Sequence, residues 1–132
     1  MSATRKVVRE GPFRKIIADG VKVGDTLYLS GQVSVTQDGE TVGAGDIAAQ
    51  VRQAYKNVAT VLASFGATMA DIVDETLFVT DIAGFLDKAD ALFGIRAEMF
   101  GGEPQVSQTL VEVSRLGSAD WLIEIKCIAR VA

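Results

Sequence analysis

Glu124 is the residue whose type and surroundings best suit acid–base chemistry. It stands between Ile123 and Ile125 in an apolar run. A carboxyl group that is removed from water holds its proton to a higher pH, and such a group can act as an acid or a base near neutral pH. The same position also suits a structural carboxylate that pairs with a neighbouring arginine or lysine. Both interpretations of Glu124 stay open at this point.

Ser30 and Gly31 form a second candidate site. The serine offers a hydroxyl group, and the glycine lets a ligand approach the backbone closely. Glycine in a strand is equally typical of a β-bulge. The adjacent acids Asp74 and Glu75 lie in an expected strand, so they point to opposite faces and do not form a carboxylate pair.

The composition excludes several kinds of site. The chain has no histidine and a single cysteine, Cys127. It therefore has no Ser-His or Cys-His nucleophile pair and no histidine ligand for zinc. A lone cysteine cannot form an internal disulfide, which favours a reducing compartment, and Cys127 is expected to be a small buried hydrophobe. We expect no metal and no cofactor.

Charge and hydropathy limit the possible partners. A net charge of −4 and a pI near 4.8 are the opposite of a polyanion-binding surface, so nucleic acid is a disfavoured partner. The longest uncharged apolar-rich stretch, residues 58–70, is shorter than the ~20 residues of a membrane span. The basic N-terminus has no apolar segment behind it, unlike a secretory signal. These features predict a cytoplasmic protein with no membrane partner.

The 132 residues form a single predicted domain, with residues 1–10 loosely ordered. Apolar positions at helical spacing follow the N-cap Asp46 and end at Gly66. A second helix is expected to begin after Asp81 and to end at the Gly101-Gly102 pair. Strands are expected at residues 26–30, 31–35, 72–80, 106–113 and 121–131, the last two joined as a hairpin through residues 116–120.

This order of elements predicts an α+β domain of two layers, with a mixed sheet and both helices on one face. The final strand is apolar on both faces, because Leu122 and Ile128 lie opposite the row that contains Ile123 and Ile125. A strand that is buried on both faces needs a second layer beyond the sheet. The sequence therefore predicts an oligomer.

Several segments, in order, resemble the YjgF/Rid family of enamine/imine deaminase-like proteins, also called endoribonuclease L-PSP. The resemblance covers nearly the whole chain from Gly11, and no single motif is diagnostic. The similar segments are Gly11-Pro12-Phe13, Leu29-Ser30-Gly31-Gln32, the helix from Ala49 to Val58, Asp71-Ile72-Val73, Phe78-Val79-Thr80-Asp81, Val111 to Leu116, and Ile123-Glu124-Ile125.

The resemblance implies a chorismate mutase-like fold assembled as a homotrimer around a central barrel, with a small-molecule pocket at each subunit interface. Active deaminases of the family hydrolyse enamines or imines derived from amino acids, without metal or cofactor. An arginine holds the substrate carboxylate, and a glutamate on the last strand places the attacking water. The resemblance gives the second role to Glu124 as the catalytic residue.

The sequence departs from the family at the expected ligand-binding residues. Gln108 stands at the arginine position, Leu110 stands where many members have cysteine, and Phe13 replaces a tyrosine. Loss of a charge-assisted clamp costs ~1.5–3 kcal/mol. Arg14 replaces that cation only if it turns into the pocket. The expected ligand-binding set is Phe13, Ser30, Gly31, Gln108, Thr109 and Leu110.

The sequence therefore predicts a divergent Rid-family homotrimer that hydrolyses an imine- or enamine-like metabolite, with weak or no activity on 2-aminoacrylate. The alternative is a trimer without enzymatic activity that binds or senses a metabolite, or acts as a chaperone. Ribonuclease activity is a third, less favoured hypothesis, because the chain is acidic and lacks histidine.

Overall fold

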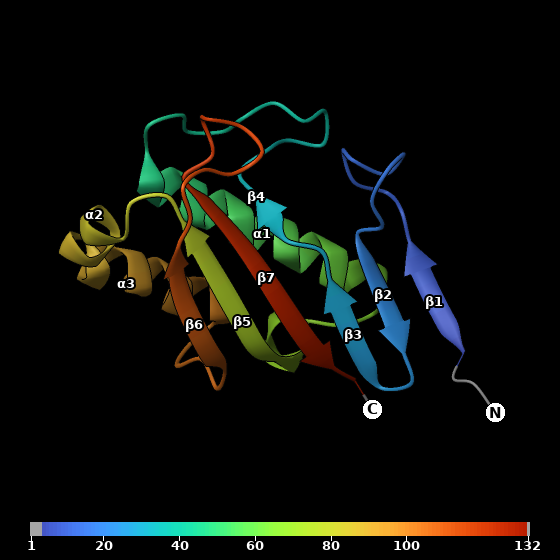
Figure 1. Ribbon diagram of the computed structural model, residues 1–132. Coiled ribbons are helices and arrows are strands. Elements are labelled where there is room, and N and C mark those ends of the chain that lie inside the picture. Colours follow the sequence, from blue (N-terminus) through green and yellow to red (C-terminus); the bar gives the residue numbers. More distant parts are fainter. Residues whose placement is uncertain (1–3, 132) are drawn as a thin grey trace.

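One mixed β-sheet organises the chain, and the helices pack on one of its faces (Figure 1). The computed structural model describes residues 4–131. The strand order is β1-β2-β3-β7-β5-β6, and β4 pairs with β7 beside the end of β3. The strands are β1 (Arg5–Val8), β2 (Gly20–Val23), β3 (Thr26–Leu29), β4 (Gln32–Val33), β5 (Ile72–Val79), β6 (Ser107–Glu112) and β7 (Ile123–Arg130). This arrangement confirms the predicted two-layer α+β class.

Helix α1 (Ile47–Ser64) lies along the sheet and forms most of the helical layer. The Asp46 side chain caps it by accepting a hydrogen bond from the Ala49 N–H. Gly66 follows its last turn at a φ of 73°, a left-handed conformation that glycine adopts at little cost. The apolar stripe of α1 packs on the inner face of β7, where Ile123, Ile125, Cys127 and Ala129 are fully buried. The predicted helix and its N-cap are confirmed.

The predicted second helix is two helices. A non-helical residue, Lys88, separates α2 (Ile82–Asp87) from α3 (Ala89–Phe100). Asp81 caps α2 as expected, and Gly101 ends α3 at a φ of 80°. The expectation of one continuous helix was wrong because apolar periodicity reports which face a residue occupies. Apolar periodicity contains no information on the backbone dihedral angles of a single exposed residue between two apolar turns.

The predicted hairpin of the last two strands was also wrong. Among residues 4–131, strand β6 pairs only with β5, in parallel, and β7 lies on the other side of β5. The segment 113–122 therefore passes over the end of β5 to reach β7. Two strand spacings amount to ~10 Å, which a segment of this length spans easily. The turn-rich composition of residues 116–120 marked a loop correctly, but a loop sequence does not say which strands it joins as neighbours.

The N-terminal part of the chain supplies one edge of the sheet. Residues 5–8, which were expected to be loosely ordered, form β1 and pair with β2 in an antiparallel register. Residues 1–3 of that expected segment lie outside the described residues. The predicted strand at 31–35 shortens to β4, and Val35 forms an isolated bridge with Thr41 across the 37–40 tip.

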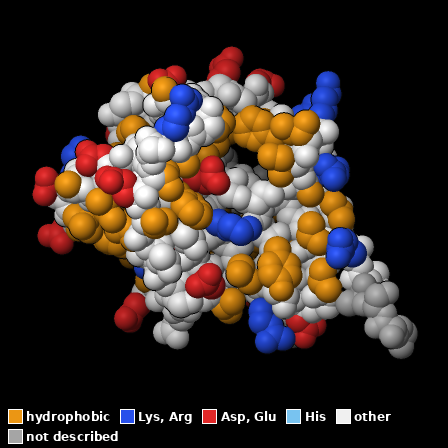
Figure 2. Space-filling view, viewed as in Figure 1, with side chains coloured by type: hydrophobic (Ala, Val, Ile, Leu, Met, Phe, Trp, Pro, Cys, Tyr) orange, Lys and Arg blue, Asp and Glu red, His pale blue; other side chains and the backbone are white. Residues whose placement is uncertain are grey.

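The sheet face opposite the helices is uncovered in this chain. Tyr28, Val7 and Val73 are each more than two-fifths exposed. Figure 2 views this face and shows hydrophobic side chains between charged ones over much of its area. A partly apolar, unpartnered sheet face agrees with the two-sided apolar pattern of the last strand.

Candidate functional site

A cavity of about 420 Å³ opens beside the outer surface of β7. Three segments form it: the loop between β1 and β2, the turn between β3 and β4, and the first half of β7. Figure 2 shows a hollow near the middle of this face. The lining residues that matter for chemistry are Phe13, Ser30, Gly31, Trp121, Glu124 and Lys126.

The loop that closes the cavity is held by local hydrogen bonds. The Asp19 carboxylate accepts bonds from the backbone N–H groups of Glu10 and Gly11, at 2.7 and 2.9 Å to Oδ2. The Ser30 hydroxyl donates to the Ala18 carbonyl at 2.6 Å. The proton of Ser30 is therefore engaged in fixing the loop, and only its oxygen lone pairs face other partners.

Two aromatic rings form the apolar wall of the cavity. Phe13 and Trp121 meet edge to face, with ring centroids 6.0 Å apart. The Trp121 indole N–H donates to the Thr41 hydroxyl at 3.1 Å, which fixes the ring. Trp121 was not predicted as a site residue, because the sequence showed it only as the first apolar residue of a strand.

Glu124 lies half-buried in this cavity, against the backbone of Gly31. A Cβ at Gly31 would lie 2.7 Å from the Glu124 carboxyl carbon, so only glycine leaves room for this carboxylate. Burial raises the pKa of Glu124, and the positive charge of Lys126 opposes that rise. The described residues contain no ion pair at Glu124, so its oxygens are available for a ligand or water.

The predicted site residues on β6 lie elsewhere. Pairing places Gln108 beside Glu75 and Cys127 on the helix-covered face, whereas Glu124 pairs with Phe78 on the uncovered face. Thr109 shares the uncovered face but is separated from β7 by β5. Leu110 packs against the core at the edge of the sheet. The structure therefore unites Phe13, Ser30, Gly31 and Glu124 and keeps Gln108, Thr109 and Leu110 apart from them.

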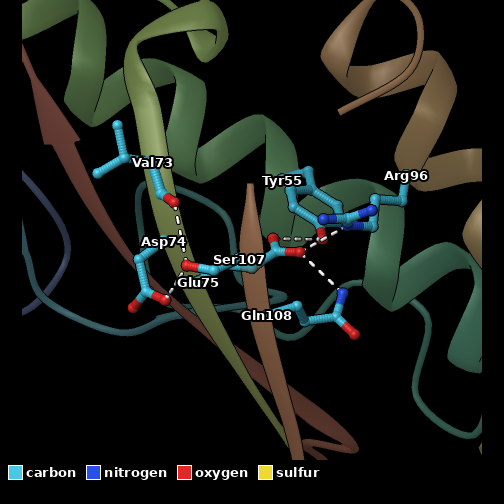
Figure 3. A network of polar contacts seen from close by, with 7 residues as sticks. All are labelled: Tyr55, Val73, Asp74, Glu75, Arg96, Ser107 and Gln108. Atoms are coloured by element: carbon cyan, nitrogen blue, oxygen red, sulfur yellow. Dashed lines mark hydrogen bonds and ion pairs between the residues drawn. The ribbon is translucent and has the colours of Figure 1, made fainter. Parts of the chain in front are cut away.

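Gln108 belongs to a buried polar network that the sequence did not reveal (Figure 3). At its centre is Glu75, which is fully buried. Glu75 accepts hydrogen bonds from the Tyr55 hydroxyl at 2.8 Å, the Arg96 Nε at 2.5 Å and the Gln108 Nε2 at 2.8 Å. Burial, and then the neighbouring Glu75 charge, raise the pKa of Tyr55 far above its usual range. The only sign of this network in the sequence was Glu75, an acidic residue at a strand position that faces the core.

Arg14 does not supply a cation to the cavity. Its Nη1 donates to the Gly11 carbonyl at 3.1 Å, and its side chain lies over a separate surface hollow beside Gln37 and Asp38. Lys126 lines the cavity instead, and it lies two residues after Glu124 on the same face of β7. A period of two along the strand was the signal that could have singled it out.

Other candidate chemistries find no support among the described residues. The Cys127 thiol is buried, and burial raises its pKa, which makes it a poor nucleophile. Residues 4–131 contain no cluster of three metal-ligating side chains. No helix in that range is both long and apolar enough to cross a membrane.

The fold and the cavity define a two-layer α+β protein with an accessible cavity on its uncovered sheet face. Residues 13–131 match the family model named endoribonuclease L-PSP. The chain is 36% identical over 111 residues to the RutC family protein YjgH of Escherichia coli, which covers 84% of this chain and 79% of the relative. It is 35% identical over 122 residues to the Escherichia coli 2-iminobutanoate/2-iminopropanoate deaminase, covering 90% and 87%. The chain therefore belongs to the endoribonuclease L-PSP family, which is the YjgF/Rid family.

Solved structures agree with this assignment. A Rid-family protein of unknown function, YyfA from Yersinia pestis, superposes with a TM-score of 0.84 at 32% identity and covers 97% of this chain and 100% of that one. The Escherichia coli YjgF gene product gives a TM-score of 0.80 at 29% identity, with 95% and 98% covered. The chorismate mutase-like fold expected from the resemblance is thus shared with these proteins.

Proposed function

We propose that this protein hydrolyses an imine- or enamine-like small metabolite to a carbonyl compound and ammonia, without metal or cofactor. The observation that carries the proposal is the placement of Glu124. It is a half-buried carboxyl with a raised pKa and no ion pair among residues 4–131, in a cavity that a small molecule can enter. The similarity to the Escherichia coli deaminase supports the same reaction class.

Glu124 acts as the general base in this proposal. Its carboxylate takes a proton from a water molecule while the water oxygen bonds to the carbon of the C=N group. With the C=N nitrogen protonated, this addition gives a carbinolamine. Glu124 passes its proton to the nitrogen and takes up the hydroxyl proton as the C–N bond breaks, so the products are a carbonyl group and ammonia, and Glu124 then releases its proton to solvent. A carboxyl whose pKa is raised toward the working pH transfers protons in both directions efficiently. Gly31 leaves the space in which the carboxylate lies.

We propose a homotrimer in which the β6 residues of one protomer complete the cavity of the next. Gln108 and Glu124 lie on opposite faces of one sheet, so a single chain does not bring them into one site. The exposed apolar side chains Tyr28, Ile17 and Val7 support burial of the uncovered side against other copies. Light scattering checks this directly, and the mass of a monomer would contradict it.

Gln108 sets the expected substrate range. A neutral amide replaces a guanidinium, and its Nε2 is already bonded to Glu75. Amides do not form the paired, charge-assisted bonds that guanidinium forms with carboxylates. We therefore expect weak or no activity on 2-aminoacrylate and better activity on substrates that present a neutral polar group to Gln108.

The second candidate function is metabolite binding without turnover, as in a sensor or a chaperone-like trimer. The inward bond from Gln108 to Glu75 favours it, because that amide stabilises the fold whether or not a substrate is processed. The two functions differ in what Glu124→Gln does. Hydrolysis requires the carboxylate, whereas binding of a neutral ligand tolerates the amide.

The deciding experiment measures imine hydrolysis. An amino-acid oxidase generates imino acids in the presence of semicarbazide, and the protein competes with the trap. We expect wild type to accelerate loss of the imines of amino acids larger than alanine, and Glu124→Gln to abolish the effect. Gln108→Arg is expected to gain activity on the smallest imino acids. An inert wild type that nevertheless binds ligand supports the sensor function, and activity that survives Glu124→Gln contradicts the proposed mechanism.

A further inference from the structure

The cavity contains a cation that has no assigned role. Lys126 lies two residues after Glu124 on β7, and both side chains reach the same cavity. Residues i and i+2 of a strand share a face and are separated by ~6.6 Å along the chain. Lys126 is close enough to lower the pKa of Glu124, but the two groups form no ion pair. The cavity therefore presents one positive and one negative group side by side.

The Lys126 ammonium group is held in place. Its Nζ donates a hydrogen bond to the Leu29 carbonyl at 2.7 Å. An ammonium group has three N–H donors, so two remain for a ligand. Glu124 lies against the backbone of Gly31, two residues after Leu29. The same backbone turn, residues 29–31, therefore contacts both charged groups.

The remaining surroundings limit which ligand charges are acceptable. Asp19 also lines the cavity, but its carboxylate is engaged by two backbone N–H groups. A ligand that carries only an anionic group is attracted by Lys126 and repelled by Glu124. A ligand that carries only a cationic group is attracted by Glu124 and repelled by Lys126. A small zwitterion satisfies both groups at once.

The apolar wall adds a preference for size. Phe13, Ile17 and Trp121 form one side of the cavity, and their apolar surface gains most from a ligand with its own apolar group. The volume of about 420 Å³ falls within the ~300–1,000 Å³ range of small-molecule sites. A three-carbon acid leaves most of this space unfilled.

We propose that Lys126 is the anion-binding, specificity-determining residue of this cavity, and that the ligand is a small amino- or imino-acid-like zwitterion with a large apolar group. The ligand carboxylate lies at Lys126, its ammonium or iminium group lies at Glu124, and its apolar group lies on Phe13 and Trp121. The cationic group is thus carried by β7 rather than by β6, where Gln108 is neutral. This inference deepens the proposed function and rests on it only in using the same cavity.

Trp121 allows a direct binding experiment because it is the only tryptophan of the chain and lines the cavity. Its fluorescence, excited where phenylalanine does not absorb, reports ligand entry. The probes are L-phenylalanine, 2-phenylethylamine, which lacks the carboxylate, and 3-phenylpropionate, which lacks the amine. We expect L-phenylalanine to bind most tightly of the three.

Variants then separate the two charged groups. A charge-assisted hydrogen bond corresponds to roughly 10- to 100-fold in Kd. Lys126→Met is therefore expected to weaken the binding of L-phenylalanine by that factor and not to weaken that of 2-phenylethylamine, whose ammonium group Lys126 repels, while Lys126→Arg retains most of the affinity for L-phenylalanine. Lys56→Met is the matched control, since it removes the same charge from the exposed side of α1 and leaves every Kd unchanged. Light scattering and thermal unfolding confirm that the variants keep the wild-type assembly and fold.

Several results would overturn the assignment. The first is that Lys126→Met weakens the binding of L-phenylalanine and of 2-phenylethylamine equally, and the second is that it does not weaken the binding of L-phenylalanine at all. The third is that Trp121 fluorescence shows no saturable response to any of the probes. The proposed function fails separately. If imines are not hydrolysed but the Lys126-dependent Kd pattern holds, binding stands without turnover. If Lys126→Met hydrolyses imino acids with an unchanged KM, the function stands and the role of Lys126 does not.

Discussion

Arg96→Met tests whether the buried network around Glu75 stabilises the fold as its geometry implies. Glu75 is fully buried, and the Arg96 side chain is 13% exposed, with Nε 2.5 Å from a Glu75 oxygen. Methionine keeps much of the apolar stem of Arg96 and removes only the charged end. The substitution leaves a buried carboxylate with two neutral donors, from Tyr55 and Gln108.

The expected cost follows from this desolvation. Removing one partner of a buried ion pair costs ~3–5 kcal/mol, because the remaining charge is left without compensation. The bonds from Tyr55 and Gln108 persist, so we expect the lower end of that range, about 3 kcal/mol. Arg96 also lies over the Phe100 ring at 5.2 Å, and loss of that contact adds ~0.5–1 kcal/mol.

Arg52→Met is the matched control. Arg52 pairs with Glu98 at 3.1 Å between α1 and α3, but the two side chains are 44% and 64% exposed. Exposed ion pairs contribute little to stability because solvent screens them, so this variant is expected to lose much less stability than Arg96→Met. The two substitutions are chemically identical, and the main difference between the two ion pairs is their burial.

Urea unfolding of both variants at one protein concentration measures the difference. A common concentration is needed because assembly changes apparent stability. We expect Arg96→Met to lose at least about 2 kcal/mol more than Arg52→Met, and the double variant Glu75→Gln with Arg96→Met to recover part of the loss. Equal losses in the two single variants would refute the assignment of a stabilising buried pair.

Three further predictions concern the cavity and the core. Glu124→Gln should raise stability more at pH 7 than at pH 4: the pKa of Glu124 is raised in the folded state, so the native carboxyl binds more protons than the unfolded one and stability falls as pH rises through that window. Thermal unfolding at both pH values checks this, and an equal effect at each would contradict it. Gly31→Ala should cost less than ~1 kcal/mol of stability, because the atoms it meets belong to the movable Glu124 side chain, yet lower kcat for imine hydrolysis at least about tenfold by displacing that carboxylate; undiminished kcat would argue against the pose of Glu124. Cys127, whose thiol pKa is raised by burial, should react with a thiol reagent such as DTNB only after unfolding, and rapid labelling of the native protein would show the site to be open.

The local pattern of the sequence determined the elements that carry the fold. Apolar spacing and the caps Asp46 and Gly66 located α1 within a residue, because those signals act over one or two turns. Alternation along residues 123–130 placed Glu124 on the face opposite the buried row. The resemblance to the Rid family followed from ordered short segments, and it correctly anticipated the shared fold.

Only the tertiary structure decided which residues meet. Strand order placed β5 between β6 and β7, and the pairing register placed Gln108 and Glu124, both expected in one site, on opposite faces of the sheet. The loop between β1 and β2 brought Phe13 to Trp121 across more than a hundred residues. The partners of Glu75 come from α1, α3 and β6, and the charged pair Glu124 and Lys126 became a candidate site only when the turn at 29–31 closed over them. Local sequence sets dihedral preferences and burial, whereas these contacts depend on how distant segments pack to bury the most apolar surface.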